Sequence, residues 1–163
     1  MPSTGNPMNI LIITQNYFPT TNKDYKVKEA IDELIKQGHK VSVVTSKGAN
    51  DTLPADSAIQ FVAINQDSFN GGGEWAYVFH GISFMWKAIK LGSAIDGNFD
   101  QVIATIPTGF AGIAGKIVAG KKNAKFILDV KEPWLESAIS AGYINNGSPV
   151  HKAAVMVDSW IKK

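Results

Sequence analysis

The sequence contains no cysteine and no arginine. Without cysteine, the chain has no disulfide framework, no thiolate zinc site and no thiol nucleophile. Without arginine, all sixteen cationic residues are lysines, so the chain lacks the bidentate guanidinium contacts that clamp phosphate groups. A phosphate contact therefore has to come from lysine or from backbone N–H groups.

A large charge excess and long apolar runs are also missing. The net charge is +2, which is too small to predict a nucleic-acid partner. The first apolar run, residues 10–13, is too short for a signal peptide and has no cationic flank. No stretch reaches the roughly 18 apolar residues of a transmembrane helix. We therefore expect a cytoplasmic protein.

The chain has the composition of one folded domain, because its 163 residues are 45% hydrophobic and 18% charged. Residues 1–7 are small and polar, and we interpret them as a tail or an expression remnant. The domain is assigned to residues 8–163. Its last residues follow a helical pattern without a cap, which predicts that the chain is a fragment of a two-domain protein.

Strand-like and helix-like segments alternate along the chain. Buried parallel strands appear as continuous aliphatic runs, and residues 9–14 form such a run. Further strands are predicted over residues 39–46, 58–64, 100–105 and 125–130. Helical patterns occupy residues 27–35, 75–91 and 108–119, a short stretch near residue 134, and residues 149–163. This alternation predicts an α/β fold with a Rossmann-like, doubly wound, mostly parallel sheet.

The first predicted helix has the clearest period. Its apolar residues recur at the spacing of an amphipathic helix: Val27, Ala30, Ile31, Leu34 and Ile35. Asp32 and Lys36 have the spacing of an ion pair on the polar side. Gly38 lies where a C-cap glycine is expected, which predicts the end of the helix there.

The helix predicted over residues 75–91 is rich in aromatic side chains: Trp75, Tyr77, Phe79, Phe84 and Trp86. Lys87 and Lys90 follow at one end. Two interpretations stay open. The segment is either a core helix with an exposed apolar face, or a surface that meets lipid at a membrane interface.

Ligands of open α/β sheets bind at the carboxyl ends of the strands, so the loops there are the candidate site. The first loop, residues 15–24, is neither the glycine-rich dinucleotide fingerprint nor a P-loop. This argues against an oxidoreductase that uses NAD or FAD. A flavodoxin-like response domain is disfavoured as well, because no phosphate loop or paired-acid pocket follows the first strand.

Four segments resemble one enzyme family. NILIITQNYFP (residues 9–19) and GHKVSVVT (residues 38–45) resemble the start of a GT-B glycosyltransferase of family 4. DQVIATIPTG (residues 100–109) and FILDVKEPWLES (residues 126–137) are similar to a bacterial subgroup that builds capsule, O-antigen and exopolysaccharide. That subgroup usually shows Asp-Val-Arg-Asp-Leu-Trp-Pro-Glu-Ser, which is matched here by Asp129, Val130, Trp134, Glu136 and Ser137.

The resemblance implies the N-terminal, acceptor-side half of a GT-B fold. Such enzymes transfer a sugar from a nucleotide-diphosphate sugar to a growing, often lipid-linked glycan. The implied partners are a C-terminal donor-binding domain, the glycan or lipid-linked acceptor, and the inner face of the membrane. The resemblance implies no cofactor and no metal in this domain, and a fragment that is inactive alone. The alternative is a non-catalytic, acceptor-binding or membrane-recruiting subunit of a split glycosyltransferase.

The resemblance also implies a set of binding residues. Where the family has a Gly-Gly pair in the first loop, this chain has Thr21, Asn22 and Lys23, and the lysine can supply charge instead. Where the family has Arg-Asp, it has Lys131 and Glu132. The acceptor or its phosphate is therefore expected to contact residues of three loops: Tyr17, Phe18, Asn22, Lys23, Thr108, Lys131 and Trp134. Tyr17 and Phe18 form either an aromatic wall for the acceptor or a plug on the core.

Two carboxylates after the fifth strand are the catalytic candidates. Glu132 and Asp129 can orient the acceptor hydroxyl or take its proton. Alternatively, Asp129 caps the loop through side-chain hydrogen bonds, and Glu132 pairs with Lys131.

Glycine and histidine are the remaining candidates for ligand contacts. Gly109, Gly112 and Gly115 either admit an anion at a helix N-terminus or let the helix lie close on the sheet, which we favour. The three histidines, at positions 39, 80 and 151, lack ligand spacing, so no metal site is predicted.

Overall fold

A five-stranded parallel sheet forms the centre of the protein. The computed structural model describes residues 6–15, 25–48, 58–67, 69–106 and 108–163. The strands lie in the order β3-β2-β1-β4-β5, and they are β1 (Asn9–Thr14), β2 (Lys40–Lys47), β3 (Ile59–Asn65), β4 (Gln101–Ile106) and β5 (Lys125–Val130). The predicted Rossmann-like α/β fold is confirmed, and each predicted strand begins and ends within one residue of the observed one.

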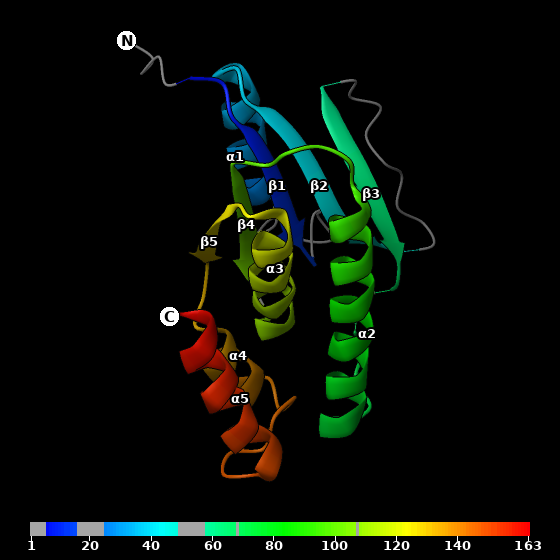
Figure 1. Ribbon diagram of the computed structural model, residues 1–163. Helices are drawn as coiled ribbons and strands as arrows, with labels where there is room; N and C mark the ends of the chain where they lie inside the picture. The colour runs from blue at the N-terminus through cyan, green and yellow to red at the C-terminus, as the bar shows by residue number, and fades with distance from the viewer. Residues whose placement is uncertain (1–5, 16–24, 49–57, 68, 107) are drawn as a thin grey trace.

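Helices cover the two faces of this sheet (Figure 1). One face carries α1 (Tyr25–Lys36), and the other carries α2 (Gly73–Ala94) and α3 (Gly109–Lys122). The chain then continues from β5 into α4 (Trp134–Ser140) and α5 (Pro149–Ile161), and α5 packs against α3. The helices predicted over residues 27–35, 75–91 and 108–119 are confirmed, and each extends a few residues further.

Each face of the sheet buries its own apolar cluster, because successive strand residues point to opposite faces. The cluster under α1 consists of Ile10, Ile12, Val27, Ile31, Val41, Val43 and Ile59. The larger cluster under α2 and α3 includes Leu11, Ile13, Val44, Phe84, Val102 and Val118. β1 contributes to both clusters, which explains why its sequence is aliphatic at consecutive positions.

The end of α1 agrees with the prediction, but its ion pair does not. Gly38 has a φ of +88°, and its N–H donates to the carbonyl of Ile35 at 2.9 Å, so the predicted C-cap is confirmed. Asp32 pairs with Lys28 at 2.6 Å, so the pair expected with Lys36 is wrong. Both lysines lie four residues from Asp32, and spacing alone does not distinguish them.

Small residues let α3 lie close to its neighbours. A Cβ added at Gly115 would be 2.6 Å from the Cβ of Ala104 on β4. At Gly109 it would be 2.7 Å from the Trp134 ring, and at Gly112 it would be 3.0 Å from a side chain of α5. The predicted close approach of α3 to the sheet is confirmed at Gly115 and, through Leu128 of β5, at Gly112, whereas Gly109 instead faces Trp134 of α4.

Candidate functional site

The strand order places a topological switch point between β1 and β4. From β1 the chain passes to β2 on one side, and β4 occupies the other side. In open α/β sheets, ligands bind outside the carboxyl ends of the strands at such a point. The candidate site therefore lies at the carboxyl ends of β1, β4 and β5, on the side toward α4 and α5 in Figure 1.

Thr108 and Gln15 connect the two sides of this switch point. The Thr108 hydroxyl donates to Oε1 of Gln15 at 2.7 Å, and Gln15, directly after β1, is buried. Thr108 is the N-cap residue of α3, yet its side chain makes no cap hydrogen bond. The amino end of α3 therefore has no side-chain cap, and its partial positive charge suits an anion.

A row of polar side chains crosses four strands near their carboxyl ends. Thr45, Thr14, Thr105 and Asp129 are neighbours in register on β2, β1, β4 and β5. The three threonines are buried. Thr14 Oγ1 has no hydrogen-bond partner among the residues that the structure describes. Buried hydroxyls are normally hydrogen-bonded, so the Thr14 hydroxyl is an exception within the described structure.

Asp129 holds the lysine that follows β5. Its Oδ2 accepts from Thr105 Oγ1 at 3.4 Å and pairs with Lys131 Nζ at 2.9 Å. The alternative in which Glu132 pairs with Lys131 is therefore not found, because the lysine turns back toward Asp129. Glu132 is exposed, and within the described part of the chain its side chain has no ion pair or hydrogen bond. Of the two predicted carboxylates, Glu132 is the one without a side-chain partner in the described part of the chain.

An apolar groove lies between α1 and the strands β4 and β5. Its volume is about 310 Å³, and its walls include Val27, Ile31, Ile103 and Ile127. Asp129 and Thr105 also line it, so the groove has one ionic and one hydroxyl group beside a mostly apolar lining.

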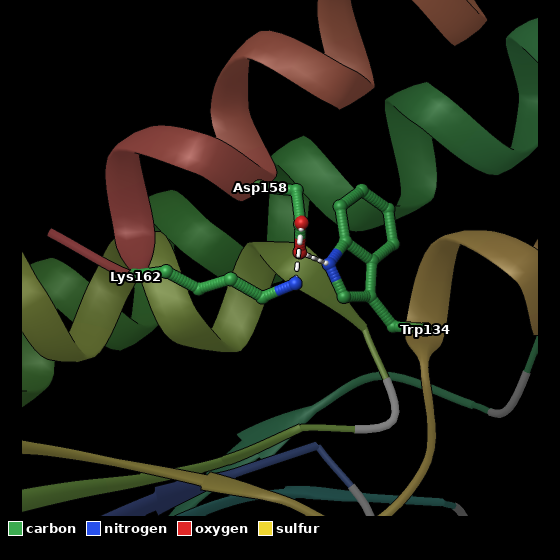
Figure 2. Close-up of polar contacts among 3 residues, drawn as sticks. All are labelled: Trp134, Asp158 and Lys162. Carbon is green, nitrogen blue, oxygen red and sulfur yellow. Dashed lines mark hydrogen bonds and ion pairs between the residues drawn. The ribbon is translucent and has the colours of Figure 1, made fainter.

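Trp134 is buried, and its polar atom is used inside the protein. Figure 2 shows its indole N–H donating to Asp158 Oδ1 at 2.7 Å, while Oδ2 of the same carboxylate pairs with Lys162 at 2.6 Å. The ring also lies against Gly109 at the start of α3. Trp134 thus fixes the turn after β5 to α3 and α5, and its predicted contact with an acceptor stays a prediction.

Each of the three histidine rings forms a hydrogen bond with a backbone group. Nδ1 of His39 accepts from the N–H of Met8 at 3.1 Å, and Nδ1 of His151 accepts from that of Gly147 at 2.9 Å. His80 Nε2 bonds the carbonyl of Asp67 at 2.9 Å. In the described part of the chain, no three histidine, aspartate or glutamate side chains gather as metal ligands.

No family model matches this sequence, and no curated protein is significantly similar to it. The fold and the site therefore rest on the chain's own residues, and the glycosyltransferase resemblance stays a prediction. Four predicted site residues lie outside the described residues: Tyr17, Phe18, Asn22 and Lys23.

The structure brings the other predicted residues to one edge of the sheet. Thr108 lies at the end of β4, and Lys131, Glu132 and Trp134 follow β5. The prediction missed Gln15 and the buried threonines at the ends of three neighbouring strands. A signal for the threonines was present, because a threonine stands at the same position near the end of three aliphatic runs, NILIIT, VSVVT and VIAT.

Proposed function

We propose that this chain is the acceptor-side domain of a GT-B glycosyltransferase that acts in the synthesis of a bacterial surface polysaccharide. One observation carries the proposal. At the carboxyl edge of the sheet, the uncapped start of α3 follows β4, and the Asp129–Lys131 pair lies at the end of the neighbouring β5. The segments that resemble the family form β1, β2, β4 and β5, and three of these strands end at the candidate site.

The proposed reaction joins an acceptor hydroxyl to a sugar. The hydroxyl oxygen attacks the anomeric carbon of a nucleotide-diphosphate sugar, the bond from that carbon to the diphosphate oxygen breaks, and the nucleoside diphosphate leaves. The hydroxyl proton passes to a carboxylate. Glu132 is our candidate for that base, because its side chain is exposed and unpaired among the described residues.

The other residues position charge for an acceptor that carries phosphate. Asp129 holds Lys131 at the carboxyl edge of the sheet, where the ammonium group can face a phosphate oxygen. The amino end of α3 adds backbone N–H groups. In this proposal the donor sugar sits on a second domain, and Lys23 in the first loop adds a further cation.

Binding of a lipid-diphosphate sugar tests the proposal directly. The probe is N-acetylglucosamine on a short polyprenyl diphosphate, added to the ¹⁵N-labelled chain. We expect amide shifts at Gln15, Gly109 and Lys131. Lys131→Gln should weaken binding about tenfold or more, since a charged hydrogen bond is lost. Lys121→Gln, at the far end of α3, is the matched control. Equal affinities of the two variants, or shifts far from this edge, would contradict the proposal.

The downstream reading frame separates the enzyme from its alternative. A frame that continues for about 150–200 residues, a usual domain size, with strand–helix alternation supports the enzyme. In that longer protein, Glu132→Gln should lower kcat about a hundredfold, as expected for loss of a general base, while Glu136→Gln in α4 should not. A frame that stops at the end of this chain instead favours a non-catalytic subunit.

A further inference from the structure

α2 is apolar on two opposite faces. One face buries Tyr77, Phe84 and Ala88 in the core. On the other face, Trp75, Phe79 and Trp86 are 63%, 67% and 64% exposed. A helix that packs on one side is normally polar on the other. The outer face of α2 therefore carries the aromatic side chains that are typical of a contact surface. In the described structure, no other element covers this face.

The exposed aromatic residues form a line along this helix. Positions 75, 79 and 86 fall on one side of an α-helix, and the line is roughly 16 Å long at 1.5 Å per residue. The rings of Trp75 and Phe79 lie 6.4 Å apart between centroids. We call Trp75, Phe79 and Trp86 the aromatic stripe.

The charge near the aromatic stripe is positive. Lys87 and Lys90 are exposed and lie within one turn of Trp86. The one acidic residue among the 22 residues of α2 is Glu74, and its carboxylate accepts from the N–H of Asn145 at 2.6 Å and from the hydroxyl of Ser148 at 2.8 Å. Glu74 is thus directed toward the start of α5. Aromatic side chains beside lysines are typical of helices that lie on anionic lipid.

The size of the aromatic stripe favours lipid over a second copy of the chain. Aromatic side chains bury about 150–250 Å² each, so at two-thirds exposure the stripe offers roughly 400 Å². A stable protein interface needs about 800 Å² on each partner. A lipid surface needs no matching partner, and anionic head groups complement the two lysines.

We propose that the outer face of α2 binds an anionic membrane surface. Trp75, Phe79 and Trp86 enter the head-group region, and Lys87 and Lys90 contact anionic head groups. Within the described residues, no helix is long and apolar enough to cross a membrane, so α2 lies along the surface. The inference uses α2 alone and holds whether or not the chain takes part in sugar transfer.

The orientation of α2 adds a consequence for the candidate site. The amino end of α2 extends past the carboxyl ends of the strands in Figure 1. Trp75 and Phe79 belong to that end. A membrane along the aromatic stripe would therefore run parallel to α2, over the face of the sheet that α2 and α3 cover, and would extend past the carboxyl ends of the strands.

Vesicle co-sedimentation tests this proposal with the full chain. Phosphatidylcholine vesicles that contain phosphatidylglycerol should bind the chain, and pure phosphatidylcholine vesicles should bind it more weakly. The triple variant Trp75→Ser/Phe79→Ser/Trp86→Ser should lower the partition coefficient at least tenfold, since about three exposed aromatic side chains lose their lipid contact. Met156→Ser, which removes a 74%-exposed apolar side chain from α5, is the control and should bind as the native chain does.

A charge variant provides a second, independent test. Lys87→Glu/Lys90→Glu should reduce binding to the anionic vesicles about tenfold or more and leave binding to pure phosphatidylcholine unchanged. Circular dichroism should show a native fold, because every substituted side chain is exposed. Absence of binding to anionic vesicles, or equal binding by both variants and the native chain, overturns the proposal. So does a dimer in solution that the triple variant abolishes.

Discussion

At the scale of single residues, Tyr77 shows how packing changes chemistry. Its ring stacks on Tyr143 with centroids 5.4 Å apart and meets the edges of Phe69 and Phe110. Burial, together with the nearby Tyr143 hydroxyl, raises the pKa of Tyr77 from 10.0 to about 12. The folded chain therefore favours the neutral phenol.

This pKa predicts a loss of stability at high pH. Between pH 10 and about 12 the folded chain keeps the Tyr77 proton that the unfolded chain releases, so stability falls as pH rises. The free energy of unfolding should fall by about 2–3 kcal/mol by about pH 12. Urea unfolding at several pH values measures it. Tyr77→Phe should remove this part of the slope, and Tyr143→Phe should keep most of it. Identical slopes in both variants would contradict the assignment to Tyr77.

Trp134 is the second residue with a measurable role. Trp134→Phe keeps an aromatic ring but removes the N–H that Asp158 accepts, leaving Lys162 as the only partner of that carboxylate in Figure 2. The free energy of unfolding should fall by about 1–3 kcal/mol in urea titrations. Trp160→Phe is the control, because Trp160 is 45% exposed and its change should stay within about 0.5 kcal/mol. Equal losses in the two variants would mean that the hydrogen bond contributes little.

At the scale of elements, α3 depends on the absence of side chains. It lies between β4, α2 and α5, and its glycines allow the close approach to β4 and α5. Glycine normally weakens a helix interior by about 0.5–1 kcal/mol relative to alanine. In α3, tight packing on three sides offsets that cost.

Two glycines of α3 give a matched pair of substitutions. Gly115→Ala places a Cβ 2.6 Å from that of Ala104 and should destabilise the fold by about 1–3 kcal/mol. Gly120→Ala meets nothing within 4 Å and should stabilise it by about 0.5–1 kcal/mol. Thermal or urea unfolding gives both values. A stabilising Gly115→Ala would show that α3 can move away from the sheet without cost.

At the scale of the whole molecule, the sequence predicted the fold because its signals are local. The aliphatic run of β1 and the 3.6-residue period of α1 can each be recognised within a dozen residues. The partners of Asp32 and Lys131 could not be recognised in this way, since each has two oppositely charged candidates nearby in sequence.

The candidate site depends on contacts between distant parts of the chain. The row of threonines appears only when the register of four strands is known. Trp134 and Asp158 are 24 residues apart, and no periodicity connects them. The sequence predicted at which edge of the sheet the candidate residues lie. It did not predict which of them already form hydrogen bonds or ion pairs with other side chains.

The order of the strands also has a consequence for synthesis. β1 pairs with β2 on one edge soon after both are made, but its other edge pairs with β4, where Ile10 meets Gln101, 91 residues later. At usual translation rates of about 5–20 residues per second, that edge waits roughly 5–20 s for its partner. During this interval the nascent chain exposes unpaired backbone groups on its most aliphatic strand, a template for wrong pairing with other chains. The ribosome-bound chain, more than the finished protein, is thus the form that most needs protection from aggregation.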